Sequence, residues 1–403
     1  MAALFIAPLY ILINLYIVRW IFAWMGSCFY LFRTWIFRAF FSGTYLFLAT
    51  ALLTGFLLKK PAWLHRILKN IGNYFLGTFL YIIMVVITVD AGRLILKHFF
   101  HVSWIGSRTA FVVTGAVCTL LIIFLSAYGI IHTMKVKVTP YEVNVNKKVE
   151  GIDSLKVVLV ADLHLGYSAG ARHAERIAAK INAENPDLVC FAGDLFDNEY
   201  DAFSQPERVK AALKSIRSTY GVYACWGNHD LNEPILAGFT FRGSAPLKED
   251  LRMKNFLIDC GFHLLDDESV LIDNRFYVVG RKDPSRSKKL RETRKTPAQL
   301  IEALDRSKPI LFIDHQPKEL DNISRAGADL DLCGHTHDGQ IFPLNLAIQF
   351  LWENPCGYLK KGEMYNIVTS GAGVWGPNMR VGTDSEICSV TVHFPHKTSQ
   401  EKQ

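Results

Sequence analysis

Residues 156–166, KVVLVADLHLG, run from an unbroken apolar stretch directly into an aspartate and a histidine. An apolar run of this length is typical of a strand buried on both faces, as in a sheet that is covered on both sides. Asp162 and His164 stand at the carboxyl end of this strand. Since ligands of layered α/β proteins collect at the carboxyl ends of strands, the stretch predicts both the fold class and the place of a site.

Four further segments repeat the pattern of a short apolar strand that ends in polar side chains. They are DLVCFAGD at 187–194, VYACWGNHD at 222–230, PILFIDHQP at 309–317 and ADLDLCGHTH at 328–337. Apolar residues at helical spacing lie between the early strands, at 172–185 and 206–217. Buried strands that alternate with helices indicate an α/β layered fold.

The five strand ends share the side chains that bind divalent transition metals such as Mn, Fe, Zn or Co. Each side chain alone has an ordinary structural explanation, such as an aspartate in a turn or a histidine in a core. Together they form a ligand set that a pure Mg or Ca site, which uses oxygen alone, would not need. Seven ligands exceed what one ion takes when positions stay open for water and substrate, so we expect two ions that share one carboxylate. The candidates are Asp162, His164, Asp194, Asn228, His315, His335 and His337.

The first third of the chain is far more apolar than the rest. Four segments approach or exceed the ~20 residues that span a bilayer, namely 4–24, about 39–58, 74–96 and 109–131. A buried helical core does not explain them, because soluble helices carry a polar face. One cleaved signal peptide would explain only one run. The sequence therefore predicts a multi-pass integral membrane protein.

An even number of spans places the N-terminus, the loop at 59–73 and everything after 131 on one side of the membrane. That side carries eight basic residues near the spans and the other side five, which favours a cytoplasmic C-terminal domain under the positive-inside rule. The eight are Lys59, Lys60, Arg66, Lys69, Lys135, Lys137, Lys147 and Lys148, and the five are Arg33, Arg38, Arg93, Lys97 and Arg108.

The net charge of +7 is most simply explained by contact with anionic lipid of the bilayer, since much of the excess of basic residues flanks membrane spans. No motif typical of nucleic-acid binding supports a nucleic-acid partner. The eight cysteines lack metal-finger spacing, so we expect free thiols. Residues 280–295 hold eight basic residues and two acids, which indicates either a solvated surface loop or a basic lip that receives phosphate or anionic lipid. No pattern indicates an oligomeric state.

The ordered blocks DxH, GD, GNHD, H and GHxH resemble the calcineurin-like metallophosphoesterase superfamily over about residues 154–394. With membrane helices before this domain, the chain is similar to the membrane-anchored, YkuE-like and transmembrane phosphoesterase branch. The resemblance implies a four-layer αββα sandwich after the transmembrane bundle. We expect a transmembrane region at 1–134, a linker strand at 135–153, the phosphoesterase domain at 154–394 and a tail at 395–403.

The resemblance also implies a role for each residue. Asp162, His164 and His337 would hold one metal, and Asn228, His315 and His335 the other, with Asp194 between the two. His229 would bind no metal and would face the leaving group, where an imidazolium acts as a general acid. Asp230, the next residue, is expected to hold the His229 ring or its pKa.

We therefore expect a membrane-anchored, dinuclear metal-dependent phosphohydrolase that cleaves a phosphodiester or pyrophosphate bond. The short tether to the bilayer favours a phosphorylated lipid or lipid-linked substrate. Alternatives are a nucleotide-sugar lipid (UDP-diacylglucosamine-type) pyrophosphatase and a non-catalytic metal-binding scaffold. In CGHTHDGQ, Asp338 stands where membrane-anchored relatives often have glycine, and aspartate tolerates a left-handed backbone better than most residues. Its carboxylate either orients His337 or faces solvent.

Overall fold

The computed structural model describes residues 2–202, 204–236, 239–240 and 247–395. The chain forms two compact units. One comprises Met1–Ile131 with Gly376–Met379, and the other comprises His132–Trp375 with Arg380–Gln403. Of the tail expected at 395–403, only Pro395 lies within the described residues.

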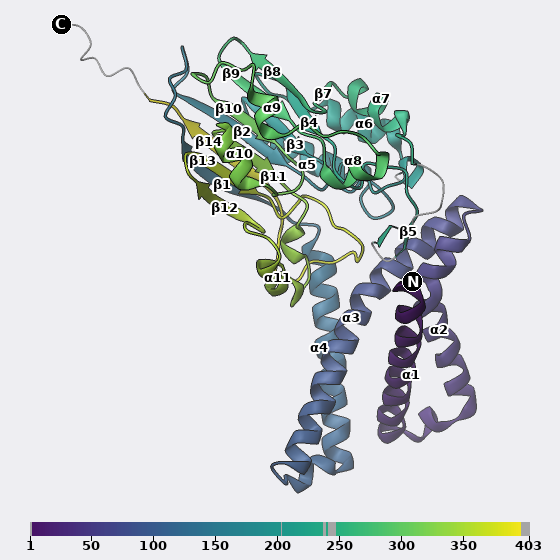
Figure 1. Cartoon of the computed structure of the whole chain (residues 1–403). Coiled ribbons are helices and arrows are strands. Elements are labelled where there is room, and N and C mark those ends of the chain that lie inside the picture. The colour runs from purple at the N-terminus through teal and green to yellow at the C-terminus, as the bar shows by residue number, and fades with distance from the viewer. Residues whose placement is uncertain (1, 203, 237–238, 241–246, 396–403) are drawn as a thin grey trace, which may run out of the picture. The chain divides into compact units, whose positions relative to one another are not determined.

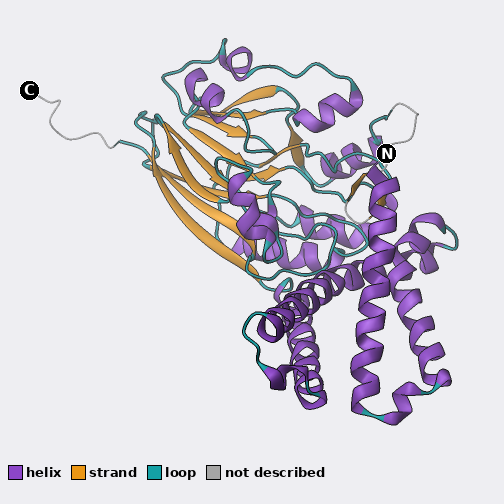
Figure 2. Ribbon diagram, turned by 60° about the horizontal axis from the view of Figure 1, so that its bottom comes forward, coloured by secondary structure: helices purple, strands orange, loops and turns teal. Residues whose placement is uncertain are grey.

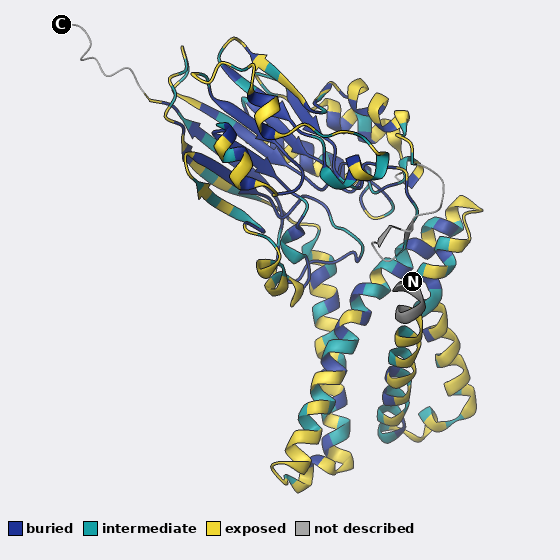
Figure 3. Ribbon diagram, viewed as in Figure 1, coloured by how far each residue is buried: buried dark blue, intermediate teal, exposed yellow. Residues whose placement is uncertain are grey.

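The first unit consists of long apolar helices (Figure 1). Four of its helices are long and apolar enough to cross a membrane, which confirms the four predicted spans. Large apolar side chains such as Leu12, Phe47 and Leu120 are exposed along them (Figure 3), as expected of surfaces that face lipid. The helices are α1 (Ala2–Cys28), α2 (Trp35–Leu57), α3 (Ala62–His98) and α4 (Arg108–His132), with short 3-10 turns η1 (Tyr30–Arg33) and η2 (Ser103–Gly106).

An acidic side chain inside this unit is matched by polar partners. Asp90 on α3 accepts hydrogen bonds from the Tyr16 hydroxyl at 2.6 Å and from the Trp20 indole at 3.0 Å, both on α1. An unpaired charge at membrane depth is costly, so these bonds stabilise the packing of α1 against α3.

The second unit is built on two mixed sheets of six strands each. The first has the order β1-β14-β2-β3-β4-β7 and the second β12-β13-β11-β10-β9-β8. The first sheet comprises β1 (Val136–Asn144), β2 (Ser154–Val160), β3 (Leu188–Ala192), β4 (Val222–Cys225), β7 (Phe262–Leu264) and β14 (Ser385–His393). The second comprises β8 (Glu268–Ile272), β9 (Phe276–Gly280), β10 (Ile310–Ile313), β11 (Leu330–Cys333), β12 (Gly357–Lys361) and β13 (Met364–Val368), and β5 (Ile235–Leu236) pairs with β6 (Phe239–Thr240).

Helices cover the outer faces of both sheets, as the predicted αββα sandwich requires (Figure 2). Three of them pack on the first sheet: α5 (Ala171–Ala183), α6 (Pro206–Lys214) and α7 (Leu251–Asp259). Two pack on the second: α9 (Pro297–Ile301) and α10 (Leu320–Ala326). Two further short helices, α8 (Pro284–Leu290) and α11 (Leu344–Ala347), lie in loops.

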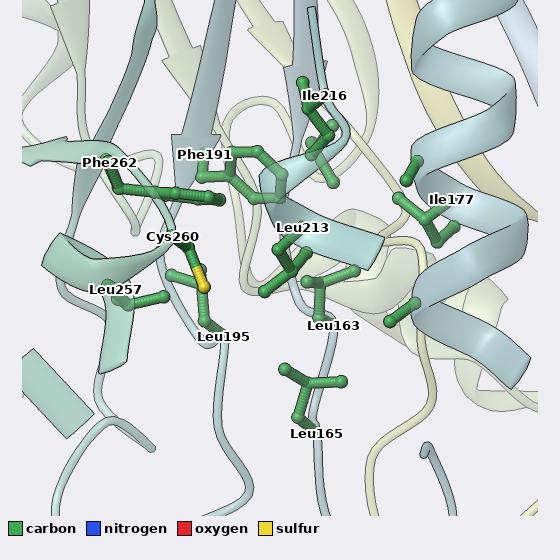
Figure 4. Close-up of a cluster of buried hydrophobic side chains, with 14 of the residues drawn as sticks. Leu163, Leu165, Ile177, Phe191, Leu195, Leu213, Ile216, Leu257, Cys260 and Phe262 are labelled. Atoms are coloured by element: carbon green, nitrogen blue, oxygen red, sulfur yellow. The ribbon is translucent and has the colours of Figure 1, made fainter. Parts of the chain in front are cut away.

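The position of strand β2 between two hydrophobic cores explains why its sequence is apolar throughout. Val158 and Val160 point into the core under α5 and α6, which Figure 4 shows in close-up, whereas Val157 and Leu159 point into the core between the two sheets. Alternate residues of a strand face opposite sides, so a strand between two cores has no solvent face. The resulting four layers confirm the predicted fold.

The segment expected as a linker strand is an integral part of the first sheet. Strand β1 pairs in parallel with β14 along its whole length, from Val136 beside Ser385 to Asn144 beside His393. Because β14 is antiparallel to β2, β1 begins at the same edge of the sheet at which β2, β3 and β4 end. Only residues 133–135 separate the last residue of α4 from the first residue of β1.

Candidate metal centre

The loops that follow β2, β3, β4, β10 and β11 converge at one edge of the two sheets. They bring all seven predicted metal ligands together, although these are spread over 176 positions from Asp162 to His337 counted inclusively. Within the described residues, Asp162, His164 and His337 form one group of potential ligands, and Asp194, His315 and His335 form another. The carboxyl ends of parallel strands meet at one edge of a sheet, which explains the convergence.

In the first group, the ligand atoms face a common point. His164 Nε2 lies 3.1 Å from His337 Nε2, and His337 Nε2 lies 3.7 Å from Asp162 Oδ1. Two ligands that each lie about 2.1 Å from one ion at right angles are about 3.0 Å apart. All three side chains are buried. The spacing therefore fits a single divalent ion.

In the second group, His315 is the centre. Its Nδ1–H donates to the Ala192 carbonyl at 2.8 Å, which leaves Nε2 with a free lone pair in the neutral ring. That Nε2 lies 3.0 Å from Asn228 Oδ1, 3.1 Å from Asp194 Oδ2 and 3.1 Å from His335 Nδ1. Electron-rich atoms at such distances repel one another unless a cation or a proton lies among them. The donor set fits a second ion.

Asp194 reaches both groups. Its Oδ2 lies 3.1 Å from His315 Nε2 and 3.9 Å from His164 Nε2, and its Oδ1 accepts the His229 backbone N–H at 2.7 Å. One carboxylate that contacts both ligand groups is the arrangement expected of two ions sharing a ligand. Asp194 thus lies between the two groups of potential ligands.

The loops hold these ligands in an unusual backbone conformation. Asp162, His164, Asp194, His335 and His337 all have φ between 45° and 76°. L-residues visit this left-handed region at a cost of roughly 1–2 kcal/mol each, and such strain is concentrated at functional sites. The surrounding sandwich must supply the stabilising free energy.

Two glycines allow the loops to approach each other. A Cβ at Gly227 would lie 2.1 Å from Asp194 Oδ1, and one at Gly334 would lie 2.5 Å from Asp162 Oδ2. Any side chain at these positions would push the ligand carboxylates away. Glycine therefore permits the close approach of the loops at both positions.

Burial and neighbouring charges set the protonation of the centre. Burial raises the pKa of Asp162 to about 6. Burial acts in the same direction on Asp194, but His315 and His229 outweigh it and hold the pKa of Asp194 well below its ordinary value. Burial lowers the pKa of His337 well below its ordinary value, which keeps the imidazole neutral and able to bind a metal.

His229 stands beside the two groups without belonging to either of the two predicted ligand sets. Its ring lies 5.1 Å from the His164 ring, and its Nδ1 hydrogen-bonds to the Asn198 side-chain oxygen. Burial lowers the pKa of His229 to about 4, an effect that an anionic phosphate beside the ring would oppose.

Asp230 does not hold the His229 ring, contrary to the sequence-based expectation. Both of its carboxylate oxygens accept backbone N–H groups, from Asp194 at 2.9 Å, Phe196 at 2.9 Å and Gly227 at 2.7 Å. It therefore ties the β3 loop to the β4 loop, and Asn198 takes the role expected of Asp230. The reason is geometric, because the side chain of Asp230 points toward the neighbouring loop.

Two further residues near the centre escaped sequence analysis. Asp197 Oδ1 lies 3.5 Å from His164 Nδ1, and Asp197 forms a third group of potential ligands with His164 and His229. Asn198 contacts His229, as described above. Both follow Asp194 closely in AGDLFDN, and that proximity was the one signal available in the sequence.

Arg380 was also missed. It is fully buried and donates to the carbonyls of Ser370 at 2.6 Å and Gly373 at 2.9 Å. Its Nη2 lies 3.4 Å from His337 Nδ1, so it is the side chain beside the ring of that ligand. Asp338 takes a left-handed conformation, with φ 50° and ψ 32°, and burial raises its pKa to about 6.

The basic segment 280–295 is more ordered than the predicted solvated surface loop, whereas a basic lip for phosphate or anionic lipid stays a prediction. Part of it folds into α8, and its charges are largely neutralised by internal ion pairs. Arg281 is fully buried against Asp314 and also pairs with Glu319. Arg286 pairs with Glu249, and Lys289 with Glu233. These pairs make the segment a packed structural element beside the β4 loop.

A pocket of about 400 Å³ opens in front of the centre. Its polar floor includes Asp194, Asn228, His229, His335 and His337. Its wall is apolar and consists mainly of Leu344, Ala347, Ile348, Leu351, Trp352 and Trp375. Trp352 and Trp375 thus line the pocket, whereas Trp226 and Phe196 lie in the core beneath α5 to α7.

Comparison with known proteins agrees with this geometry. The family model described as calcineurin-like phosphoesterase matches residues 155–339. An uncharacterized metallophosphoesterase of Campylobacter jejuni is 30% identical, over 70% of this chain and 69% of that protein. A transmembrane protein with metallophosphoesterase domain of Danio rerio is 27% identical, over 66% of this chain and 60% of that protein.

A more distant relative has a named activity. The UDP-2,3-diacylglucosamine pyrophosphatase LpxG of Chlamydia trachomatis is 24% identical, over 51% of this chain and 70% of that protein. The converging ligands, the sandwich and these relatives agree with one another. The chain belongs to the calcineurin-like phosphoesterase family, as a metallophosphoesterase hydrolase with a candidate dinuclear metal site and membrane-spanning helices.

Proposed function

We propose that this membrane protein hydrolyses a phosphodiester or pyrophosphate bond in a phosphorylated lipid or lipid-linked substrate. The observation that carries the proposal is the pocket itself, whose floor is a two-group ligand set and whose wall is apolar. A phosphate group fits the floor and a hydrocarbon chain fits the wall.

In this proposal Asp162, His164 and His337 bind one ion, Asn228, His315 and His335 bind the other, and Asp194 binds both. When bound, two divalent ions supply activation of water and neutralisation of phosphoryl charge. Imidazole and carboxylate suit Mn, Fe, Zn or Co. Asp230 contributes by keeping the β3 and β4 loops in register, which places Asp194 and Asn228 correctly.

His229 is the proposed proton donor. Asn198 holds its Nδ1, and the ring lines the pocket, so Nε2 is available to the substrate. When the ester bond breaks, the leaving oxygen gains negative charge, and the imidazolium form of His229, which the anionic substrate favours, would donate its Nε2 proton to that oxygen and become the neutral ring. Acid catalysis of this kind is typically worth ~100 to 10,000-fold in rate.

The test uses the purified full-length chain in detergent with Mn²⁺ and bis-p-nitrophenyl phosphate. We expect metal-dependent turnover that is lost in Asp194→Ala and reduced at least about 100-fold in His229→Ala. Glu302→Ala, which removes an exposed carboxylate at the end of α9, is the matched control. Full turnover by an Asp194→Ala, His229→Ala double variant would refute the proposed mechanism.

A second candidate substrate is a nucleotide-linked glycolipid with a pyrophosphate bond. The name of the chlamydial relative favours it, since that protein is a UDP-2,3-diacylglucosamine pyrophosphatase. Mass spectrometry of lipid extracts from cells with and without the active protein would separate the candidates. Accumulation of a pyrophosphate-linked lipid in the inactive strain would favour the second, and accumulation of a simple phospholipid the first. A non-catalytic scaffold predicts no metal-dependent turnover at all.

The catalytic unit is proposed to lie in the cytoplasm. The distribution of eight against five basic residues near the spans supports this orientation. A protease site inserted in the 147–148 region should be protected in intact cells and cleaved in inverted vesicles. Cleavage in intact cells would reverse the assignment.

A further inference from the structure

The segment that leaves the metal centre after His337 is unusually apolar. Residues 341–352 read IFPLNLAIQFLW and contain no charged residue. They form α11 and the 3-10 turn η5 (Ile348–Phe350). Phe350 is 90% exposed and Leu351 is 73% exposed, and Phe342, Leu344 and Leu346 are also exposed. Figure 3 shows α11 largely in the colour of exposed residues.

Exposed apolar residues that occur singly are normal, but a contiguous patch marks an interaction surface. Here five large apolar side chains gather within ten positions of one loop. The same loop forms part of the pocket wall through Leu344, Ala347 and Ile348, together with Leu351 and Trp352. One short segment therefore presents apolar side chains both outward and toward the metal centre.

The segment is held in place by specific contacts. The Phe342 backbone N–H donates to the Val381 carbonyl at 2.8 Å. The Gln340 side chain donates to the Trp375 carbonyl and accepts the Trp375 N–H, both at 2.8 Å. A Cβ at Gly339, whose φ is 73°, would lie 2.6 Å from the Asn345 nitrogen. The outward display of apolar side chains is therefore built into the fold.

A cation lies against one of the aromatic residues that line the pocket. The Lys318 ammonium lies 5.0 Å from the centre of the Trp352 ring, and that ring lies 5.2 Å from the His335 ring. Lys318 is exposed. A lysine stacked on a tryptophan is a pair that suits the lipid headgroup region, where the ring is half in hydrocarbon and the ammonium meets phosphate.

The chain connection between α4 and β1 is short. Three residues, 133–135, lie between the last residue of α4 and the first residue of β1, so the Cα atoms of those two residues, four steps apart, are separated by at most about 14 Å. Strand β1 begins at the sheet edge that carries the metal centre. The Nε2 atom of His132, the last residue of α4, lies 2.8 Å from the Oδ1 atom of Asp384, the residue just before β14.

We propose that residues 342–351 form a membrane lip: a segment that lies in the lipid interface and guides the hydrocarbon chains of a substrate from the bilayer into the pocket. The inference rests on the proposed phosphohydrolase function for the step at the metal centre, but not for the membrane contact itself. Exposed Leu346 and Phe350 are in contact with lipid, Leu344 and Leu351 stand at the pocket mouth, and Lys318 receives the headgroup.

The first experiment measures lipid contact without any activity. A photocrosslinking benzoyl-phenylalanine replaces Phe350 in the full-length protein, which is reconstituted in nanodiscs of phosphatidylcholine and phosphatidylglycerol. The control carries the same group at Leu271, an exposed position on β8 near the start of β9, at the opposite end of the sheets from the centre. We expect a lipid adduct by mass spectrometry at position 350 and none at 271. Equal or absent lipid labelling at the two positions would overturn the membrane lip.

The second experiment compares two phosphodiesters with the same scissile bond, p-nitrophenyl ethyl phosphate and p-nitrophenyl hexadecyl phosphate. In Leu346→Ser, Phe350→Ser we expect kcat/KM for the hexadecyl ester to fall by about tenfold or more, while that for the ethyl ester stays within about twofold. The conservative variant Leu346→Met, Phe350→Leu should retain the preference for the long chain. A serine variant with an unchanged ratio of the two esters would refute the guiding role.

The two proposals fail in different ways. A lipid adduct at position 350 together with no turnover of either ester would refute the phosphohydrolase function and leave the membrane contact standing. Turnover of both esters without an adduct and without chain-length dependence would refute the membrane lip alone.

Discussion

At the scale of single residues, the centre depends on side chains that bind no metal. Asn198 holds His229 by its Nδ1, and Arg380 stands beside the Nδ1 of His337. Outer contacts of this kind fix the orientation and tautomer of a ring, and their loss typically costs about 10- to 100-fold in metal affinity or activity.

Asn198→Ala should lower kcat about 10- to 100-fold and leave KM nearly unchanged, because it releases the His229 ring without altering the pocket. The measurement is steady-state turnover of bis-p-nitrophenyl phosphate. The double variant with His229→Ala should be no slower than His229→Ala alone, since the two residues act as one unit. Asn322→Ala on the exposed face of α10 is the control. Additive losses in the double variant would assign Asn198 a separate role.

Arg380→Lys should weaken metal binding about 10- to 100-fold, because an ammonium cannot reach the carbonyls and the His337 ring together. Calorimetric titration of the metal-free protein with Mn²⁺ or Zn²⁺ measures the affinity directly. Arg306→Lys, at an exposed position, should leave the affinity unchanged. An unchanged metal affinity in Arg380→Lys would show that the planar guanidinium group of Arg380, with its several N–H donors, is not needed for metal binding.

At the scale of secondary-structure elements, α5 carries a buried titratable group. Burial, together with Arg176 and Arg380, lowers the pKa of His173 to about 4. The folded state therefore keeps the ring neutral while the unfolded chain, with a pKa near 6.5, takes up a proton. Stability contributed by His173 is complete above pH 6.5 and is lost as the pH falls toward 4.

His173→Gln should remove about 3 kcal/mol of pH dependence between pH 7 and pH 4, because the pKa of His173 is about 4 in the folded state and about 6.5 in the unfolded state, and each pKa unit corresponds to about 1.36 kcal/mol. The difference in melting temperature between variant and wild type should thus change sign or shrink between pH 7 and pH 5. Thermal unfolding at fixed metal concentration measures it. If the difference in melting temperature does not change with pH, the acid sensitivity of the fold comes from groups other than His173.

The first strand of the catalytic unit is a second case at this scale. Val136, Val143 and Val145 are buried, so a fragment that starts at residue 154 loses apolar contacts and exposes the edge of β14. We expect fragment 133–395 to fold and fragment 154–395 to aggregate or to melt at a much lower temperature. Circular dichroism of the two purified fragments decides this. Equal stability would mean that β1 is a linker after all.

At the scale of the whole molecule, the ions link the stability of the sandwich to its activity. Chelation removes the charges that the buried carboxylates and imidazoles require, so turnover should stop and the melting temperature of the catalytic unit should fall. An ion at about 100 times its Kd stabilises the fold by about 2.7 kcal/mol. Added Mn²⁺ should restore both. In His335→Ala, His337→Ala the chelator should change neither quantity, and a persisting effect would indicate binding outside the proposed site.

Much of the site was predictable because each ligand follows an apolar strand directly. The signal is local: strand, then glycine or turn, then ligand, as in ADLH and CGHTH. The contacts of Asn198, Asp230 and Arg380 were not predictable, since they depend on the direction in which loops from different strands pass each other. Asp230 illustrates this, because it follows His229 in sequence yet ties together two loops through the backbone of Asp194 and Gly227.

The sequence by itself determined the four candidate spans, the buried strands and the seven candidate ligands, because hydrophobic runs and strand-end chemistry are properties of neighbouring residues. Only the tertiary structure decided that β1 belongs to the first sheet, that Asn198 rather than Asp230 holds His229, and that residues 342–351 stand exposed beside the pocket. These features depend on which distant segments meet. Apolar residues such as Leu346 and Phe350 have the same sequence pattern whether a core or a bilayer covers them, and only the folded surface distinguishes the two.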